Sequence, residues 1–528
     1  MEIYKSSKII HNFSKSHFQC CVFKRKDIIL LPNHIVFYTC SDMNKEQAYL
    51  ARIVFTVVLG GLLFGYDTAV ISGAEKGLQA FFLQAQDFQY TDVWHGITSS
   101  SALIGCIFGC LISGWYASKF GRKMALLLSG IFFLLSAIQS YYPEFLFFEY
   151  GRPSFTLLIA FNLYRILGGI GVGMASAICP MYIAEISPAE IRGKLVSCNQ
   201  FTIILGQLVV YLVNYFIVGD HTNPVIEKIS EGIYILDTAS SDSWSVSTGW
   251  RYMFVSEAIP AAIFTLLICF IPETPRFLVM NGNDKKAFHI LTRINGYDKA
   301  RQILEEIKEN ISPEKKNLFA YGWTVIFIGI MLCVFQQITG INAVMYFGPR
   351  IFGSFESPVN PMASTVMVGV VNIIMTIVSI FLIERIGRKP LLVYGVIGMA
   401  MGAAGIALSN ILLVPSLIPL LCVLFYIACF GLSWGPVCWV LVSEIFPNTI
   451  RSKAMGLASA FVWISNFVVS FTFIPIYNMS IGELGVHFGH IAVYAVYGVC
   501  CIIAAVFVWR LVPETKGKTL EKMNSLWK

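Results

Sequence analysis

Three ionisable residues lie inside otherwise uncharged hydrophobic stretches of this chain: Asp67, Arg165 and Glu257. An ionised side chain at the centre of a membrane costs at least about 3 kcal/mol, so such residues normally face a partner or a water-filled cavity. Two acids accompany one arginine, and one bound proton would therefore neutralise the set. Because arginine does not release its proton in proteins, Asp67 or Glu257 must be the group that binds and releases it. The alternative is a static ion pair that only fastens two helices.

A second set of residues could bind an uncharged solute that carries several hydroxyl groups. Amide side chains both donate and accept hydrogen bonds, and aromatic rings cover apolar C–H faces. Gln200, Gln207 and Asn214 are spaced seven residues apart and so share one face of a helix. Further candidates lie in three other hydrophobic stretches, and they are Gln336, Gln337, Asn342, Tyr346, Asn372, Gly435 and Trp439.

Each of these amides could alternatively serve as a hydrogen bond between helices. Their convergence from four helices favours a binding site instead. Gly340 lies between Gln337 and Asn342, and Gly435-Pro436 precedes Trp439, so a helix break or hinge is expected at each place. Since no charged residue accompanies the amides, the sequence predicts a sugar or a cyclitol rather than an ion as the solute.

The composition identifies the kind of element that must position these residues. Of the 528 residues, 56% are hydrophobic and only 13% are charged, about half the charged share of a soluble domain. This excludes a soluble enzyme, a soluble binding module and a disordered chain. The net charge of +7 is scattered over short clusters, so no nucleic-acid partner is expected. The 14 cysteines form no CxxC or Cys/His ligand spacing, and we predict neither a disulfide framework nor a metal site.

Hydrophobic stretches long enough to cross a membrane predict twelve transmembrane helices. Ten segments have no charged residue or contain a single one, and two helices fill the eleventh, 390–443, with a turn near Asn410 to Pro419. Seven segments are free of charge: 93–118, 124–143, 195–219, 317–349, 357–383, 454–482 and 484–509. Three contain one charge: 53–73, 153–184 and 252–272. Basic residues concentrate in alternate loops, which places both termini in the cytoplasm.

The remaining segments complete the predicted organisation. Residues 1–42 match no element, and we interpret them as a non-native or disordered N-terminal extension, with Met43 as a plausible start. Residues 43–272 form the first six-helix half and 317–512 the second. Between them, 273–316 is predicted to be a cytoplasmic helical linker, and 513–528 a cytoplasmic tail. Within the first half, the polar segment 220–250 is predicted to be an external loop.

Three motifs occur twice in the same order, which predicts two parallel repeats. Gly121-Arg122-Lys123 returns as Gly387-Arg388-Lys389, and Pro272-Glu273-Thr274 returns as Pro513-Glu514-Thr515; the third pair centres on Glu185 and Glu444. Salt bridges between these acids and arginines could hold the two halves together on the cytoplasmic side. The alternative is that they are topology signals on solvated faces. The candidate gate residues are Arg122, Glu185, Arg192, Glu273, Arg276, Arg388, Glu444, Arg451 and Glu514.

From Met43 onward the chain resembles the sugar porter family of the major facilitator superfamily, and in particular its xylose-transporting members. The resemblance is carried by Gly60 to Asp67, Pro272 to Arg276, Gln336-Gln337 with Gly340 to Asn342, Ser433 to Trp439, and Pro513 to Gly517. It implies an all-α membrane protein with two six-helix halves that carries sugar by alternating access. The resemblance also implies sugar contacts at Gln200, Gln336, Gln337, Asn342 and Trp439, and an aromatic lining at Phe64 and Tyr346.

An aspartate at the position of Asp67 is found in proton-coupled members of that family. The resemblance therefore implies proton symport of a neutral monosaccharide, D-xylose or a similar pentose or hexose, with the proton as coupling ion and no other cofactor. One departure concerns Val462, because many relatives have an amide side chain at this position, before Trp463. Losing a sugar hydrogen bond there would weaken recognition by about 1 kcal/mol.

Other functions stay open at this point. A facilitative sugar uniporter is one alternative, and a proton symporter for myo-inositol, arabinose or galactose is another. An intramembrane enzyme is rejected, because His95, His487 and His490 have no acid or cysteine at ligand spacing. We expect a monomer in the lipid bilayer of the cell membrane.

Overall fold

A computed structural model of the chain describes residues 45–145, 147–188, 191–219, 224, 226–230, 233–237, 243–311, 319, 321–355, 359–412, 414, 417–447, 450–481 and 487–516. The predicted extension 1–42 and the tail beyond residue 516 lie outside the described residues. The chain divides into two compact units, Met1–Ala48 and Tyr49–Lys528. Only residues 45–48 of the first unit are described, in the first turn of a helix, and every contact given below lies within the second unit.

The first half contains six membrane-spanning segments. They are α2 (Lys45–Leu83), α3 (Asp92–Phe120), α4 (Arg122–Tyr141), α5 (Phe155–Ile186), α6 (Arg192–Val218) and a sixth that consists of the π-helical turn η1 (Ser245–Gly249), α7 (Trp250–Ser256) and α8 (Ala258–Ile268). The sixth is interrupted at Glu257, because Pro260 has no N–H to donate to the carbonyl of Ser256.

The second half repeats this arrangement with two helices that are each broken once. Its helices are α12 (Trp323–Ile338), α13 (Ile341–Gly353), α14 (Pro361–Ile386), α15 (Arg388–Leu412), α16 (Leu417–Leu432), α17 (Trp434–Ile445), α18 (Arg451–Tyr477) and α19 (His487–Leu511). Twelve segments of the described chain are long and apolar enough to cross a membrane. The prediction of twelve helices is confirmed, including the division of 390–443 into two.

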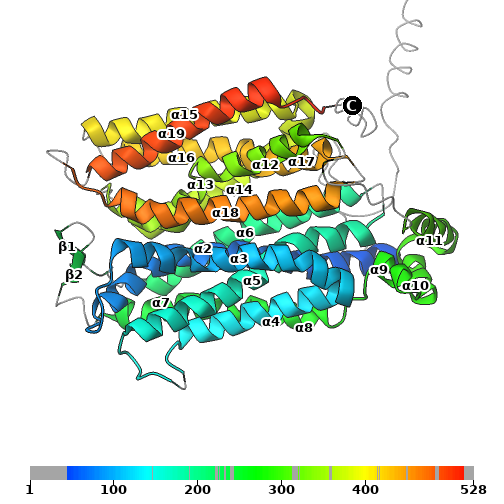
Figure 1. Cartoon of the computed structure of the whole chain (residues 1–528), viewed down its shortest axis with the longest axis horizontal. Helices are drawn as coiled ribbons and strands as arrows, with labels where there is room; N and C mark the ends of the chain where they lie inside the picture. Colours follow the sequence, from blue (N-terminus) through cyan, green and yellow to red (C-terminus); the bar gives the residue numbers. More distant parts are fainter. Residues whose placement is uncertain are drawn as a thin grey trace, which may run out of the picture. The chain divides into compact units, whose positions relative to one another are not determined.

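The ends of the membrane helices carry two further substructures. Three short helices, α9 (Pro275–Met280), α10 (Asp284–Asn295) and α11 (Tyr297–Ile311), occupy the segment predicted to be a helical linker. Strands β1 (Ile226–Ser230) and β2 (Ile233–Leu236) form an antiparallel hairpin where only a loop was predicted. Figure 1 shows the hairpin at one end of the helices and α9–α11 at the opposite end. These are called the hairpin end and the linker end below.

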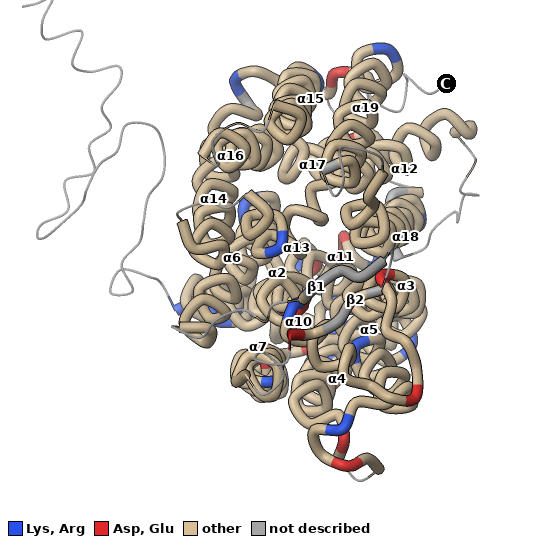
Figure 2. The backbone as a smooth tube through the Cα atoms, turned by 90° about the vertical axis from the view of Figure 1, so that its left-hand side faces the viewer, with Lys and Arg blue, Asp and Glu red and all other residues tan. Residues whose placement is uncertain are grey.

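The two halves meet along two pairs of helices. Helix α3 packs against α18, and α6 packs against α14. Figure 2 shows the helices from the hairpin end, with most of the tube free of charged residues. A proton or a solute that crosses the molecule must therefore be received by the few polar side chains between the helices.

Candidate functional site

The three ionisable residues of the hydrophobic stretches come together inside the first half. Arg165 on α5 donates from Nη1 to Oδ1 of Asp67 on α2 at 2.6 Å, and from Nη2 to the main-chain oxygen of Asp67 at 3.3 Å. The guanidinium carbon of Arg165 also lies 4.8 Å from the centre of the Phe254 ring. Glu257, at the break between α7 and α8, is within electrostatic range of both Asp67 and Arg165.

The two carboxyl groups of this cluster have spare acceptor atoms. Asp67 is 0% exposed and Glu257 is 1% exposed. Yet Oδ2 of Asp67 and both side-chain oxygens of Glu257 accept no hydrogen bond from the residues that the structure describes. A buried ionised carboxylate without hydrogen bonds costs several kcal/mol. A proton is a ligand that these unpaired oxygens can receive.

The seventh membrane segment is broken at Gly340, between α12 and α13. Gly340 has φ 90° and ψ 12°, and a Cβ atom there would lie 2.2 Å from the ring of Tyr497. A left-handed backbone and such close contact both require glycine. The Tyr426 hydroxyl donates a hydrogen bond to the main-chain carbonyl of Thr339, just before the break. The expected break is present, and it turns the side chains on either side of it toward one another.

Three amides form a chain across this break. Asn342 donates to Oε1 of Gln337, and Gln337 donates to Oε1 of Gln336 at 3.3 Å. Gln336 in turn donates to the main-chain oxygens of Trp434 at 2.9 Å and Gly435 at 3.3 Å. These two carbonyls lie beside Ser433, where α16 ends and α17 begins, so the amide chain joins the breaks of the seventh and tenth segments.

The other predicted solute contacts make no hydrogen bond to this chain in the described structure. Gln200 and Gln207 on α6 are half-buried, and in the described part of the chain neither amide makes a hydrogen bond. Asn372 on α14 is buried with Oδ1 unpaired among described residues, whereas Asn214 donates to the carbonyl of Val70 and so links two helices. Trp439 on α17 is half-buried. Polar or aromatic groups that could contact a solute are therefore available at four of these residues: Gln200, Gln207, Asn372 and Trp439.

Aromatic side chains from both halves also meet between the helices. The rings of Phe64 on α2 and Trp463 on α18 are 5.2 Å apart. Tyr346 on α13 is buried, and its hydroxyl accepts a hydrogen bond of 3.0 Å from Asn466. The sequence interpretation missed Asn466. It lies one helical turn after Val462, so the amide sought before Trp463 is present one turn along the same face.

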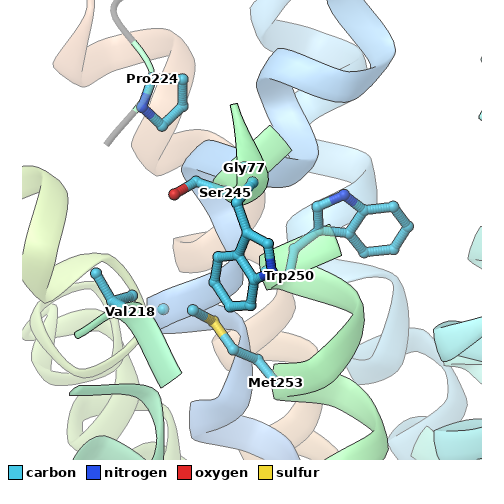
Figure 3. A pocket seen from close by; sticks show the side chains of 9 residues that line it. Gly77, Val218, Pro224, Ser245, Trp250 and Met253 are labelled. Carbon is cyan, nitrogen blue, oxygen red and sulfur yellow. The ribbon is translucent and has the colours of Figure 1, made fainter. Parts of the chain in front are cut away.

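A small apolar pocket lies toward the hairpin end of the first half. Its lining includes Val218, Pro224, Trp250 and Met253 (Figure 3). The volume of about 10 Å³ holds about one water molecule and no sugar. This pocket is therefore separate from the amide chain and is no candidate for the solute site.

The duplicated motifs build two equivalent clusters at the linker end. Arg122 donates to Glu185 at 2.9 Å, which also accepts from the Thr274 hydroxyl at 2.6 Å. In the second half, Arg388 donates to Glu444 at 3.0 Å, and Thr515 donates to Glu444 at 2.6 Å. Each ion pair joins two residues of the same half, and neither of them links the two halves.

The remaining acids of the clusters bind main-chain groups instead of arginine side chains. Glu273 accepts from the N–H groups of Arg122 and Lys123, at 3.1 and 3.0 Å, and so caps the start of α4. Glu514 accepts from the N–H groups of Arg388 and Lys389, at 3.2 and 2.9 Å, at the start of α15.

Two candidate gate arginines do not join these clusters in the described part of the chain. Arg192 and Arg276 are exposed and form no ion pair with residues that the structure describes. The side chain of Arg451 lies outside the described residues.

A further polar cluster, which the sequence did not indicate, lies toward the hairpin end. Glu75 on α2 pairs with Arg350 on α13 and with His95 on α3, at 2.8 Å in each case. The predicted first helix stopped at residue 73 because charged residues follow, but α2 continues to Leu83. Its continuation is possible because the Glu75 charge is paired. His95 therefore has an acidic partner, which its sequence neighbourhood did not show.

Known proteins resemble this chain over most of its length. A sequence profile of the family described as "Sugar (and other) transporter" matches residues 53–527. The D-xylose-proton symporter of Escherichia coli (strain K12) is 42% identical over 91% of this chain and 96% of its own length. The arabinose-proton symporter of Bacillus subtilis (strain 168) is 35% identical, and the glucose facilitated diffusion protein of Zymomonas mobilis is 34% identical. These two matches cover 91% and 92% of this chain, and 96% and 98% of the relatives.

Solved structures show the same similarity. The partially occluded inward-open conformation of the xylose transporter XylE from E. coli superposes with a TM-score of 0.78 at 41% identity, over 89% of this chain and 100% of the other. The inward-open conformation of XylE gives a TM-score of 0.77 over 91% of this chain and 100% of the other.

Proposed function

Because the chain belongs to the sugar transporter family of the major facilitator superfamily, we propose that it carries a neutral monosaccharide into the cell together with a proton. It is a multi-pass membrane transporter and not an enzyme. D-xylose is the first candidate substrate, since the relative at 42% identity is a D-xylose-proton symporter. Arabinose, another pentose or hexose such as galactose, and myo-inositol are the next candidates.

The buried Asp67–Arg165 pair with Glu257 beside it is the observation that carries the proposal of proton coupling. The pair is held at 2.6 Å, and three carboxyl oxygens around it are unpaired among the described residues. A conformational change that separates Arg165 from Asp67 changes the charge around both acids, and hence their affinity for a proton. The proton is thus bound in one conformation and released in the other, with no other cofactor.

The sugar is proposed to bind at the amide chain of Gln336, Gln337 and Asn342. Gln200, Gln207 and Asn372 supply further hydrogen bonds to its hydroxyl groups. Phe64, Tyr346 and Trp439 cover its C–H faces, and Gly435 gives backbone access at the break of the tenth segment. No charged side chain is among these residues, which fits a neutral solute.

The clusters at the linker end are proposed to form the cytoplasmic gate. Their ion pairs, Arg122–Glu185 and Arg388–Glu444, lie within each half here. Closing this end brings the two equivalent clusters against each other, where the exposed Arg192 and Arg276 gain partners. We place both termini in the cytoplasm, the chain as a monomer in the cytoplasmic membrane, and the domain boundaries at 43–272, 273–316 and 317–512.

A facilitative uniporter is the second candidate function. It is favoured by the 34% identity to a glucose facilitated diffusion protein. The two functions differ in whether the buried acids exchange a proton during transport.

The test uses the purified full chain in proteoliposomes with an external pH indicator. Adding D-xylose should make the outside alkaline as protons enter with the sugar, and a potential of 100 mV should support accumulation of about 50-fold. Asp67→Asn should retain sugar counterflow but lose accumulation, because an amide takes up no proton. Asp284→Asn, in the exposed Asp284–Lys308 pair, is the matched control and should behave as wild type.

Counterflow without alkalinisation in the wild-type protein would establish the uniporter. If Asp67→Asn still accumulated sugar, a group other than Asp67 would have to carry the coupled proton. A panel of unlabelled pentoses, hexoses and inositols, competing with xylose for uptake, identifies the preferred substrate.

A further inference from the structure

The hairpin end holds an ion pair that joins the two halves of the molecule. Arg350 on α13 of the second half donates from Nε and Nη2 to the two carboxylate oxygens of Glu75 on α2, at 2.9 and 2.8 Å. Nη2 also donates to Oε1 of Gln79, one turn further along α2. A two-pronged contact of this kind is among the strongest and most directional side-chain interactions.

The first half presents this acceptor as a rigid socket. His95 on α3 lies with Nε2 at 2.8 Å from the Glu75 carboxylate, and its Nδ1 lies 3.1 Å from the hydroxyl of Tyr90. Glu75 and His95 are 0% exposed, and the Arg350 side chain is 13% exposed. The carboxylate is therefore held in place from its own half before Arg350 reaches it.

Two other contacts between the halves lie near this pair. Asn478, at the end of α18, donates to Oδ1 of Asp92 at the start of α3, at 2.9 Å. Tyr211 on α6 donates to the main-chain oxygen of Met345 at 2.8 Å. Tyr234 of the hairpin donates to the other oxygen of Asp92, so the hairpin is tied to the same contact region. At the linker end, in contrast, the ion pairs described above stay within each half.

We propose that Arg350 and the Glu75–His95–Gln79 socket form a latch that holds the hairpin end closed and is released once in each transport cycle. The proposal rests on the alternating-access function proposed above, since that function requires the halves to separate at this end. A permanent bond across them would stop the cycle, whereas an ion pair can exchange its partner for water.

The socket explains how release is tolerated. A buried carboxylate that loses its only partner is destabilised by several kcal/mol. When Arg350 withdraws, Glu75 keeps His95, which belongs to the same half and moves with it. Arg350, the more exposed member, becomes hydrated. The latch can therefore open without leaving the Glu75 carboxylate bare of hydrogen-bond partners.

The test measures opening directly, without sugar, by hydrogen–deuterium exchange of the purified full chain. The variants are Glu75→Gln, Arg350→Gln and the double variant. Each single variant should speed the slow amide exchange of residues 75–83 and 345–353 by at least about tenfold. The double variant should add little, because both changes remove the same contact.

Matched controls separate latch opening from general destabilisation. Glu149→Gln and Arg152→Gln alter an exposed ion pair of 2.6 Å within the first half, and exchange should stay at the wild-type rate. The helix pair α15 and α19, which packs within the second half, should also be unaffected in all variants. Arg350→Lys keeps the charge but not the two-pronged geometry, so it should give a smaller increase if the glutamine variants do not fold.

Unchanged exchange at residues 75–83 and 345–353 would overturn the latch. So would an equal increase in α15 and α19, or effects of the two single variants that multiply in the double variant. Because no sugar is present, a failed latch is distinguishable from a failed transport function, which the alkalinisation assay tests alone.

Discussion

Gly121 offers a quantitative test of the capped helix start at the linker end. Its backbone has φ 102° and ψ 160°, a conformation that other residues adopt only at a cost of about 1–3 kcal/mol. A Cβ atom at this position would also lie 2.3 Å from Oε2 of Glu273. That oxygen accepts the N–H of Lys123, so Gly121→Ala must displace it. Loss of one hydrogen bond to a charged group adds about 1.5–3 kcal/mol to the backbone strain.

Two other glycines serve as internal references. Gly322 has nearly the same backbone, with φ 87° and ψ 166°, but a Cβ atom there meets nothing within 4 Å. Gly387, the repeat of Gly121, would place its Cβ atom 2.9 Å from Oε2 of Glu514, a contact that a small shift relieves. The free energy of unfolding should therefore fall most in Gly121→Ala, less in Gly387→Ala and least in Gly322→Ala.

The assay is irreversible thermal inactivation of the detergent-purified chain at one fixed temperature, followed by tryptophan fluorescence. Gly121→Ala should inactivate about tenfold faster than Gly322→Ala, which corresponds to about 1.4 kcal/mol in the unfolding barrier. In a Glu273→Ala background, Gly121→Ala and Gly322→Ala should have similar effects. Equal rates for the two variants in the wild-type background would refute the assignment of Glu273 as the cap.

Three further outcomes are expected. Val462→Gln restores an amide before Trp463 and should increase the apparent affinity for D-xylose about fivefold, near 1 kcal/mol, in competition uptake; no gain would point to another substrate. Asn466→Ala removes the hydrogen bond to Tyr346 and should raise the half-saturating sugar concentration about fivefold, whereas an unchanged value would place Tyr346 outside the sugar site. Burial raises the pKa of the Glu273 carboxyl above its ordinary value, so the folded chain binds a proton more readily there than the unfolded chain. The stability that Glu273 contributes is therefore full below about pH 4.5 and falls as the pH rises through the raised pKa. The free energy of unfolding of wild type minus that of Glu273→Gln should accordingly fall as the pH rises through this range, and a signed difference that rises with pH would contradict the assignment.

The sequence predicted the helices well because hydrophobic length alone determines which segments can cross a membrane. It also indicated that Asp67, Arg165 and Glu257 are significant, since charges inside such segments are rare. It could not show that Glu273 and Glu514 bind main-chain N–H groups, because an arginine and a helix start are both attractive partners for a carboxylate. It missed Glu75, His95 and Arg350, which are separated by 20 and 275 residues from one another. Only the folded arrangement brings them together.

The hydrogen-bonded chain of Gln336, Gln337 and Asn342 has a consequence for how firmly a sugar can be retained. These amides already hydrogen-bond one another, and Gln336 donates to two backbone carbonyls. At this proposed sugar site, an arriving hydroxyl group must take the place of an existing bond, so the net gain per contact is small. Modest affinity and a short residence time follow, and these suit a protein whose task is to hand its cargo on rather than to store it.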